Sequence, residues 1–69
     1  MTIGDSMREA VRTGNAALAG RAADFLRRQG LRYKDIAKMA VKVTGCDPRD
    51  WEALLYQADE TDGAGGGRG

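Results

Sequence analysis

The chain has 69 residues, with 11 Lys and Arg against 10 Asp and Glu, one Cys and no His. This length allows one domain and leaves little room for a substrate pocket, since such pockets measure roughly 300–1,000 Å³. A single Cys cannot form a disulfide within the chain, and without His it cannot complete a zinc site. The composition therefore argues against a disulfide-stabilised fold, a structural metal and an enzyme that uses a histidine base.

The charges are distributed unevenly although the net charge is only +1. Residues 1–46 carry nine basic and four acidic side chains, whereas residues 47–69 carry two basic and six acidic ones. Such opposed halves favour electrostatic pairing with a charged partner or with a second copy of the chain. No stretch approaches the ~20 apolar residues of a membrane span, and residues 1–7 lack the pattern of a secretory signal. With the lone Cys, this predicts a cytoplasmic protein, for which we expect no cofactor and no metal.

The first predicted helix spans residues 6–13. Ser6 and Glu9 fit a capping box, in which the Ser6 hydroxyl accepts from the Glu9 N–H and the Glu9 carboxylate accepts from the Ser6 N–H. The residues before Ser6 are expected to fray. Gly14 suits a left-handed C-terminal cap and Asn15 suits an N-cap, so we expect the helix to end there.

The second predicted helix spans residues 16–29. Apolar positions at spacings of three and four predict a buried stripe of Leu18, Ala22, Phe25 and Leu26. Between them lies a run of small residues that lets another helix approach closely: Ala16, Ala17, Ala19, Gly20, Ala22 and Ala23. That helix belongs either to the same chain or to a second copy. Gly30 is expected to cap the helix, with Leu31 making the accompanying apolar contact.

The third predicted helix spans residues 33–44, and its apolar positions again follow helical spacing. The expected inward residues are Tyr33, Ile36, Ala37, Ala40 and Val43. On the opposite side, three lysines four residues apart form a basic stripe: Lys34, Lys38 and Lys42.

The fourth predicted helix spans residues 48–60. Asp47 is expected to be its N-cap, and Pro48 suits the first helical position because its missing N–H costs nothing there. Its apolar face consists of Trp51, Leu54, Leu55 and Ala58. The following residues, 61–69, are rich in Gly and lack apolar side chains to bury, so we expect a disordered tail.

Residues 30–40 read Gly-Leu-Arg-Tyr-Lys-Asp-Ile-Ala-Lys-Met-Ala, which resembles the first helix of many bacterial helix-turn-helix regulators. The resemblance implies that Ala37 lies where two helices cross and that Ile36 and Ala40 are core residues. It also implies nucleic-acid binding. The chain departs from that pattern after Ala40, because the next Gly comes only at Gly45.

The start of the fourth helix also departs from the helix-turn-helix pattern, because its carboxylates would oppose DNA phosphates: Asp47, Asp50 and Glu52. Nucleic acid would instead meet a basic face through its backbone. The candidate nucleic-acid-binding residues on that face are Arg27, Arg28, Arg32, Lys34, Lys38 and Lys42.

The sequence thus predicts an all-α fold, a small bundle of four short helices with a helix-turn-helix-like hairpin. Residues 1–60 would form a single helical domain, followed by the disordered Gly-rich tail. We expect a non-enzymatic protein–protein interaction module that binds a protein partner or itself; small accessory, regulatory or phage-type inhibitor proteins fit this description. Candidate partner-binding residues are Arg49, Glu52 and Tyr56, because interface hot spots favour Arg and Tyr. The alternative is a helix-turn-helix-like nucleic-acid-binding regulator that uses the basic face.

Overall fold

The computed structural model describes the backbone of residues 2–62 and the side chains of residues 2–59. This part of the chain contains four helices and no strand, which confirms the predicted all-α class. The helices are α1 (Ile3–Thr13), α2 (Ala16–Arg28), α3 (Tyr33–Thr44) and α4 (Pro48–Asp62). The last helix runs two residues beyond its predicted end. The rest of the predicted tail, residues 63–69, lies outside the described residues.

The start of α1 differs from the prediction. The helix begins at Ile3, and its capping box is formed by Thr2 and Asp5 rather than by Ser6 and Glu9. The Asp5 N–H donates to Thr2 Oγ1 at 3.1 Å, and the Thr2 N–H donates to Asp5 Oδ2 at 3.3 Å. Both residue pairs have the required spacing, and the earlier pair adds almost a turn of helix whose Ile3 side chain packs against the core.

This capping box makes the stability of the protein sensitive to acid. Hydrogen bonds from the Thr2 backbone N–H and hydroxyl, with a smaller effect of Arg8, hold the pKa of Asp5 below its usual value of 3.8. The pKa of Asp5 is therefore lower in the folded protein than in the unfolded chain. The ionised Asp5 carboxylate stabilises the fold fully above its unfolded pKa, and this stabilisation is lost as the pH falls through its folded pKa. We expect Asp5→Asn to be less stable than wild type at pH 7, with a difference that shrinks below about pH 4. Urea midpoints of both proteins from pH 7 to pH 2 measure it, and a pH-independent difference would contradict the capping role.

The connections before and after α2 lie close to their predicted positions. Gly14 adopts a left-handed conformation with φ of 68°, and Asn15 Oδ1 then accepts from the Leu18 N–H at 3.1 Å. The helix ends at Arg28, one residue before the predicted end. Gly30 is also left-handed, with φ of 100°, and the Leu31 N–H donates to the Leu26 carbonyl at 3.1 Å. This bond across the turn is the pattern expected when Gly follows a helix.

A three-residue connection, residues 45–47, joins α3 to α4, and its hydrogen bonds confirm the predicted start of α4. Asp47 Oδ1 accepts from the Arg49 N–H at 3.2 Å, and Pro48 is the first helical residue. The Cys46 N–H donates to Thr44 Oγ1 at 3.1 Å. Side-chain oxygens of Thr44 and Asp47 thus accept hydrogen bonds from backbone N–H groups before and after the turn. These bonds fix the direction in which α4 leaves α3.

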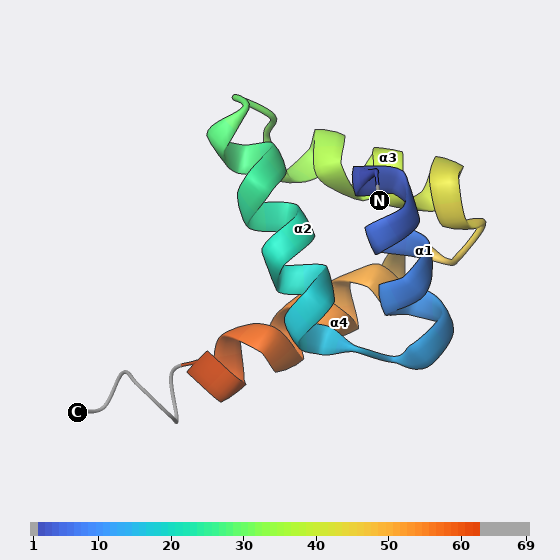
Figure 1. Ribbon diagram of the computed structural model, residues 1–69, viewed down its shortest axis with the longest axis vertical. Helices are drawn as coiled ribbons and strands as arrows, with labels where there is room; N and C mark the ends of the chain where they lie inside the picture. The colour runs from blue at the N-terminus through green and yellow to red at the C-terminus, as the bar shows by residue number, and fades with distance from the viewer. Residues whose placement is uncertain (1, 63–69) are drawn as a thin grey trace.

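The four helices cross at steep angles instead of lying parallel (Figure 1). In this view α2 runs across the molecule, with α3 near its C-terminal end and α4 near its N-terminal end. The helix α1 packs against both α2 and α3, and α4 packs against α2 and α3. Every helix therefore covers part of one shared core. None of the helices in the described region has the length and apolar character needed to cross a bilayer.

The core is built around three large side chains that are fully buried, Trp51, Met7 and Ile36. Small residues fill the space between them: Ala10, Ala19, Ala22, Ala23 and Ala40. The indole Nε1–H of Trp51 is buried and has no hydrogen-bond partner among the described residues. Trp51 therefore contributes to stability through its apolar surface alone, since its polar group is left unpaired.

The small residues of α2 let a helix of the same chain approach closely. A Cβ atom placed on Gly20 would lie 3.0 Å from the Cβ of Ala58 on α4. This confirms the simpler of the two predictions for the small-residue run, that of packing within the chain.

Two aromatic residues were assigned to the interior wrongly. Phe25 is 51% exposed and Tyr33 is 47% exposed. The buried side of α2 is centred on Ala22 and Leu26, and Phe25 lies about 100° from Leu26 around the helix axis. Tyr33 is the first residue of α3 and follows the exposed Arg32, so it lies at the edge of the core.

Candidate functional site

The predicted partner-binding residues lie together on one exposed side of α4. With 100° per residue, Arg49, Glu52 and Tyr56 fall within a sector of about 60° and span about two turns. All three are exposed, and Tyr56 has 72% of its surface accessible. Their spacing therefore places a cation, an anion and an aromatic ring on one surface, pointing away from the Trp51 side of the helix.

Tyr33 extends this surface from a second helix. Partial burial raises the pKa of its phenol above the ordinary value of 10.0, and the nearby Glu52 and Tyr56 raise it further. The charges of these two α4 side chains therefore reach the Tyr33 phenol at the start of α3. We call the surface formed by Tyr33, Arg49, Glu52 and Tyr56 the tyrosine face. Sequence reasoning missed Tyr33, although its place at the first position of a helix is a signal of reduced coverage.

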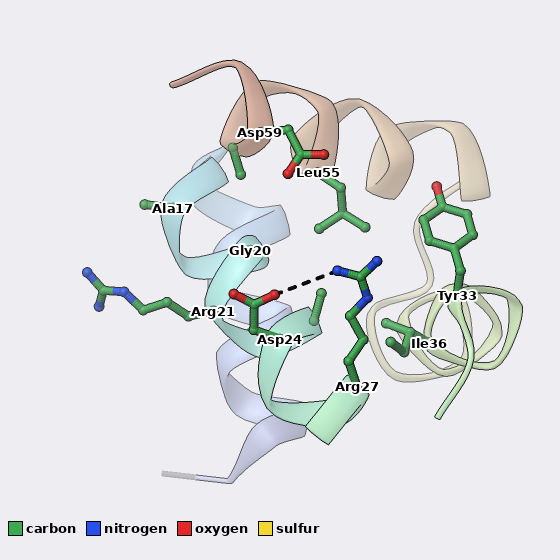
Figure 2. A pocket seen from close by; sticks show the side chains of 11 residues that line it. Ala17, Gly20, Arg21, Asp24, Arg27, Tyr33, Ile36, Leu55 and Asp59 are labelled. Carbon is green, nitrogen blue, oxygen red and sulfur yellow. Dashed lines mark ion pairs between the residues drawn. The ribbon is translucent and has the colours of Figure 1, made fainter. Parts of the chain in front are cut away.

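A groove of about 380 Å³ opens next to the tyrosine face, between α2, α4 and the first turns of α3. Tyr33 stands at one end of it, and Leu55 of α4 points into it from above (Figure 2). The apolar part of its lining consists of Gly20, Ala23, Ile36, Leu55 and Ala58. Because Gly20 and Ala58 have almost no side chain, α2 and α4 touch there and the groove stays shallow above them.

The charged side chains of the groove are of both signs. Arg27 Nη1 lies 3.9 Å from Asp24 Oδ1, and this ion pair spans the wall formed by α2 (Figure 2). Arg21 points outward on the same helix, and Asp59 lies on α4 across the groove. All four side chains are exposed, so water competes with their interactions. The groove thus has exposed charges of both signs around an apolar lining.

The lysines of the basic stripe lie along the outer side of α3. Lys34, Lys38 and Lys42 are exposed, and no ion pair involves them among the side chains that the structure describes. A shallow apolar groove of about 280 Å³ lies beside them, lined by Ala37, Lys38, Val41, Lys42 and Pro48.

The six predicted nucleic-acid-binding residues lie on α2, on α3 and in the connection between them, and those that line a groove are divided between two grooves. Arg27 lines the groove between α2 and α4 and pairs with Asp24, whereas Lys38 and Lys42 line the other groove. Arg28 is the last residue of α2 and Arg32 precedes α3, and both are exposed. The structure thus reduces the collinear part of the predicted basic face to the three lysines of α3.

Among the described residues, no group of three or more acidic or Cys side chains gathers in a way that could hold a metal ion. Cys46, in the turn before α4, is half-buried and packs against the core.

Comparison with known proteins found no match, whether to protein-family models, to curated proteins or to solved structures.

Proposed function

We propose that this chain is a non-enzymatic protein–protein interaction module and that the tyrosine face, with the groove beside it, is its binding surface. The observation that carries the proposal is the pair of exposed tyrosines, Tyr33 and Tyr56, which come from two different helices on the side of the molecule that also carries Glu52. Large aromatic side chains of a small soluble domain are normally withdrawn from water. Exposed aromatic and Arg side chains concentrate at protein interfaces, where they supply most of the binding energy.

The surroundings of the two tyrosines support binding of a protein surface. Tyr33 and Tyr56 are held on helices, so little conformational entropy is lost when a partner covers them. The charges of Arg49 and Glu52 beside them would orient the partner more than they would strengthen binding. The groove then offers Leu55 and Ile36 as apolar contacts next to an exposed rim. The single Cys fits a reducing compartment such as the cytosol, where we expect the module to act.

Nucleic-acid binding through the basic stripe is a second candidate. It is favoured by the three exposed lysines of α3, which have no ion pair among the described side chains. Lysines spaced four apart could follow a phosphate backbone without reading bases. Binding of this kind would fall steeply as the salt concentration rises, because counterions return to the phosphates.

The substitution Tyr56→Ala tests the proposed function. We expect it to abolish recovery of the partner in affinity isolation from the native cell, because loss of a central interface tyrosine costs about 2 kcal/mol or more, roughly 30-fold in Kd. The fold should be unaffected, since Tyr56 is 72% exposed. Circular dichroism of the purified variant checks this.

Two control proteins separate the candidates. Phe25→Ala removes another large exposed aromatic residue, one outside the tyrosine face, and should retain the partner. Lys34→Glu combined with Lys38→Glu reverses the basic stripe and should also retain it. The opposite result would favour the second candidate. In that case the Tyr56→Ala protein still recovers the partner, whereas reversal of the lysines abolishes both partner recovery and salt-sensitive nucleic-acid binding.

A further inference from the structure

Arg49 and Glu52 carry opposite charges on the same exposed face, yet neither takes part in an ion pair among the side chains that the structure describes. They are separated by almost one turn of α4, or about 4.5 Å along the helix axis. Arg8, Arg12 and Arg27 each pair with a carboxylate three residues earlier, whereas Arg49, like the other exposed cations, pairs with none among the described side chains. The tyrosine face therefore presents one unmatched cation and one unmatched anion side by side.

Such a pair is complementary to itself under a two-fold rotation. When two copies of α4 lie antiparallel, with the axis passing between residues 49 and 52, Arg49 of each copy faces Glu52 of the other. Both ion pairs form at once, because a two-fold interface makes every contact twice. A parallel arrangement would instead place Arg49 against Arg49 and Glu52 against Glu52, which is repulsive. The charge pattern thus selects one orientation.

We propose that the partner of the tyrosine face is a second copy of this chain, with the first turns of α4 (residues 48–53) packed antiparallel and joined by reciprocal Arg49–Glu52 ion pairs. This inference rests on the proposed function, since it assigns an occupant to the same surface.

The tyrosines complete this arrangement. Tyr56 lies 5.5 residues, or about 8 Å, beyond the two-fold axis along α4, so in the antiparallel pair it falls opposite residue 45 of the other copy, in the turn that precedes α4. Tyr33 stands beside Glu52 from α3. Helices that pack together approach to about 8–10 Å between axes, a distance that the Arg and Glu side chains can bridge. The aromatic rings would then shield the two ion pairs from water, which strengthens them.

Sedimentation velocity and light scattering of the purified full chain, from about 10 µM to about 1 mM, test the proposal over the range of weak interfaces. The wild-type mass should rise with concentration from 7.4 kDa towards twice that value. Arg49→Glu and Glu52→Arg should each weaken self-association at least about tenfold, because each reversal turns two attractive contacts into two repulsive ones. Gln57→Lys, a change at an exposed position about 100° further round the helix, should leave association unchanged.

Mixing the two charge-reversal variants gives the decisive result. At positions 49 and 52 the Arg49→Glu chain carries two carboxylates, whereas the Glu52→Arg chain carries two guanidinium groups. The antiparallel pair therefore sets opposite charges against each other at both contacts, so the mixture should form a heterodimer although each variant alone is monomeric. The double variant Arg49→Glu with Glu52→Arg should regain self-association. Circular dichroism of each variant confirms that the helices are intact.

Three outcomes would overturn the proposal: a wild-type chain that stays monomeric throughout, self-association that ignores the reversals, or a mixture that fails to pair. These outcomes are separate from failure of the proposed function. A monomeric wild type that still captures another protein through Tyr56 would remove the second copy as occupant and leave the interaction module standing.

Discussion

Trp51→Ala is expected to lower the free energy of unfolding by about 3–5 kcal/mol, the largest loss expected of any single truncation in this core. Trp51 is fully buried at the centre of the core, and truncation of a buried Trp costs about 3–5 kcal/mol. A domain of this size has a total stability of roughly 3–10 kcal/mol, at about 0.05–0.15 kcal/mol per residue. The loss is therefore comparable to the whole free energy of unfolding. Circular dichroism and urea unfolding measure it directly.

Two further substitutions show whether the cost comes from burial of the indole. Phe25→Ala removes a large aromatic side chain that is 51% exposed, and it should cost under about 1 kcal/mol. Trp51→Phe should cost less than Trp51→Ala, because it leaves a smaller cavity and removes the buried N–H that has no partner. A Trp51→Ala protein as stable as Phe25→Ala would show that the core is arranged differently.

Gly20→Val is expected to destabilise the protein by about 1–3 kcal/mol, the usual cost of forcing extra atoms into a packed interior. Even a single Cβ at this position would lie 3.0 Å from the Cβ of Ala58, and Val adds two methyl groups to that atom. Val has one strongly preferred rotamer in a helix, so it cannot easily turn away. The expected response is a shift of α4 away from α2, seen as a lower urea midpoint.

Ala17→Val provides the matched control for Gly20→Val, because Ala17 is exposed on the same helix. It introduces the same side chain without the contact to α4. The cost at Gly20 should also fall when Ala58→Gly is added, since this removes the atom that the new side chain meets. Equal stability of Gly20→Val and Ala17→Val, or no coupling to Ala58, would argue against close packing at this point.

The positions of the helices could be predicted well because their ends depend on local chemistry. The Asn15 side chain accepts a hydrogen bond from a backbone N–H three residues later, and Asp47 before Pro48 gives an equally local signal. The start of α1 was misplaced because two capping pairs, Thr2 with Asp5 and Ser6 with Glu9, compete within one stretch. The choice between them depends on whether Ile3 can reach the core, which spacing alone does not reveal.

The burial of the aromatic residues was less predictable. The spacing of Phe25 fits a buried stripe as well as that of Leu26 does, yet only Leu26 is buried. Small residues at Ala19, Ala22 and Ala23 bring the neighbouring helices close to α2, which leaves no space for a ring on that side. How closely helices approach is a property of the tertiary structure, and it overrides the periodic pattern of one helix.

The candidate site also has a part that local spacing predicts and a part that depends on the tertiary structure. Helical spacing is enough to place Arg49, Glu52 and Tyr56 on one side of α4. The contribution of Tyr33 and the groove beside it depend on how α3 and α4 cross, and they could be found only in the folded chain. The structure likewise separates Arg27 from the lysine stripe, although these cations are close in the sequence.

Photo-crosslinking in the native cell is the most direct measurement of whether the tyrosine face is the working surface. A benzophenone amino acid would be placed at one position at a time. Position 56 probes the tyrosine face, position 25 is an exposed aromatic position outside it, and position 38 probes the basic stripe. We expect a discrete protein adduct from position 56, including an adduct with a second copy of the chain, and none from position 25. Equal adducts from positions 25 and 56, or a nucleic-acid adduct from position 38 as the sole product, would contradict the account.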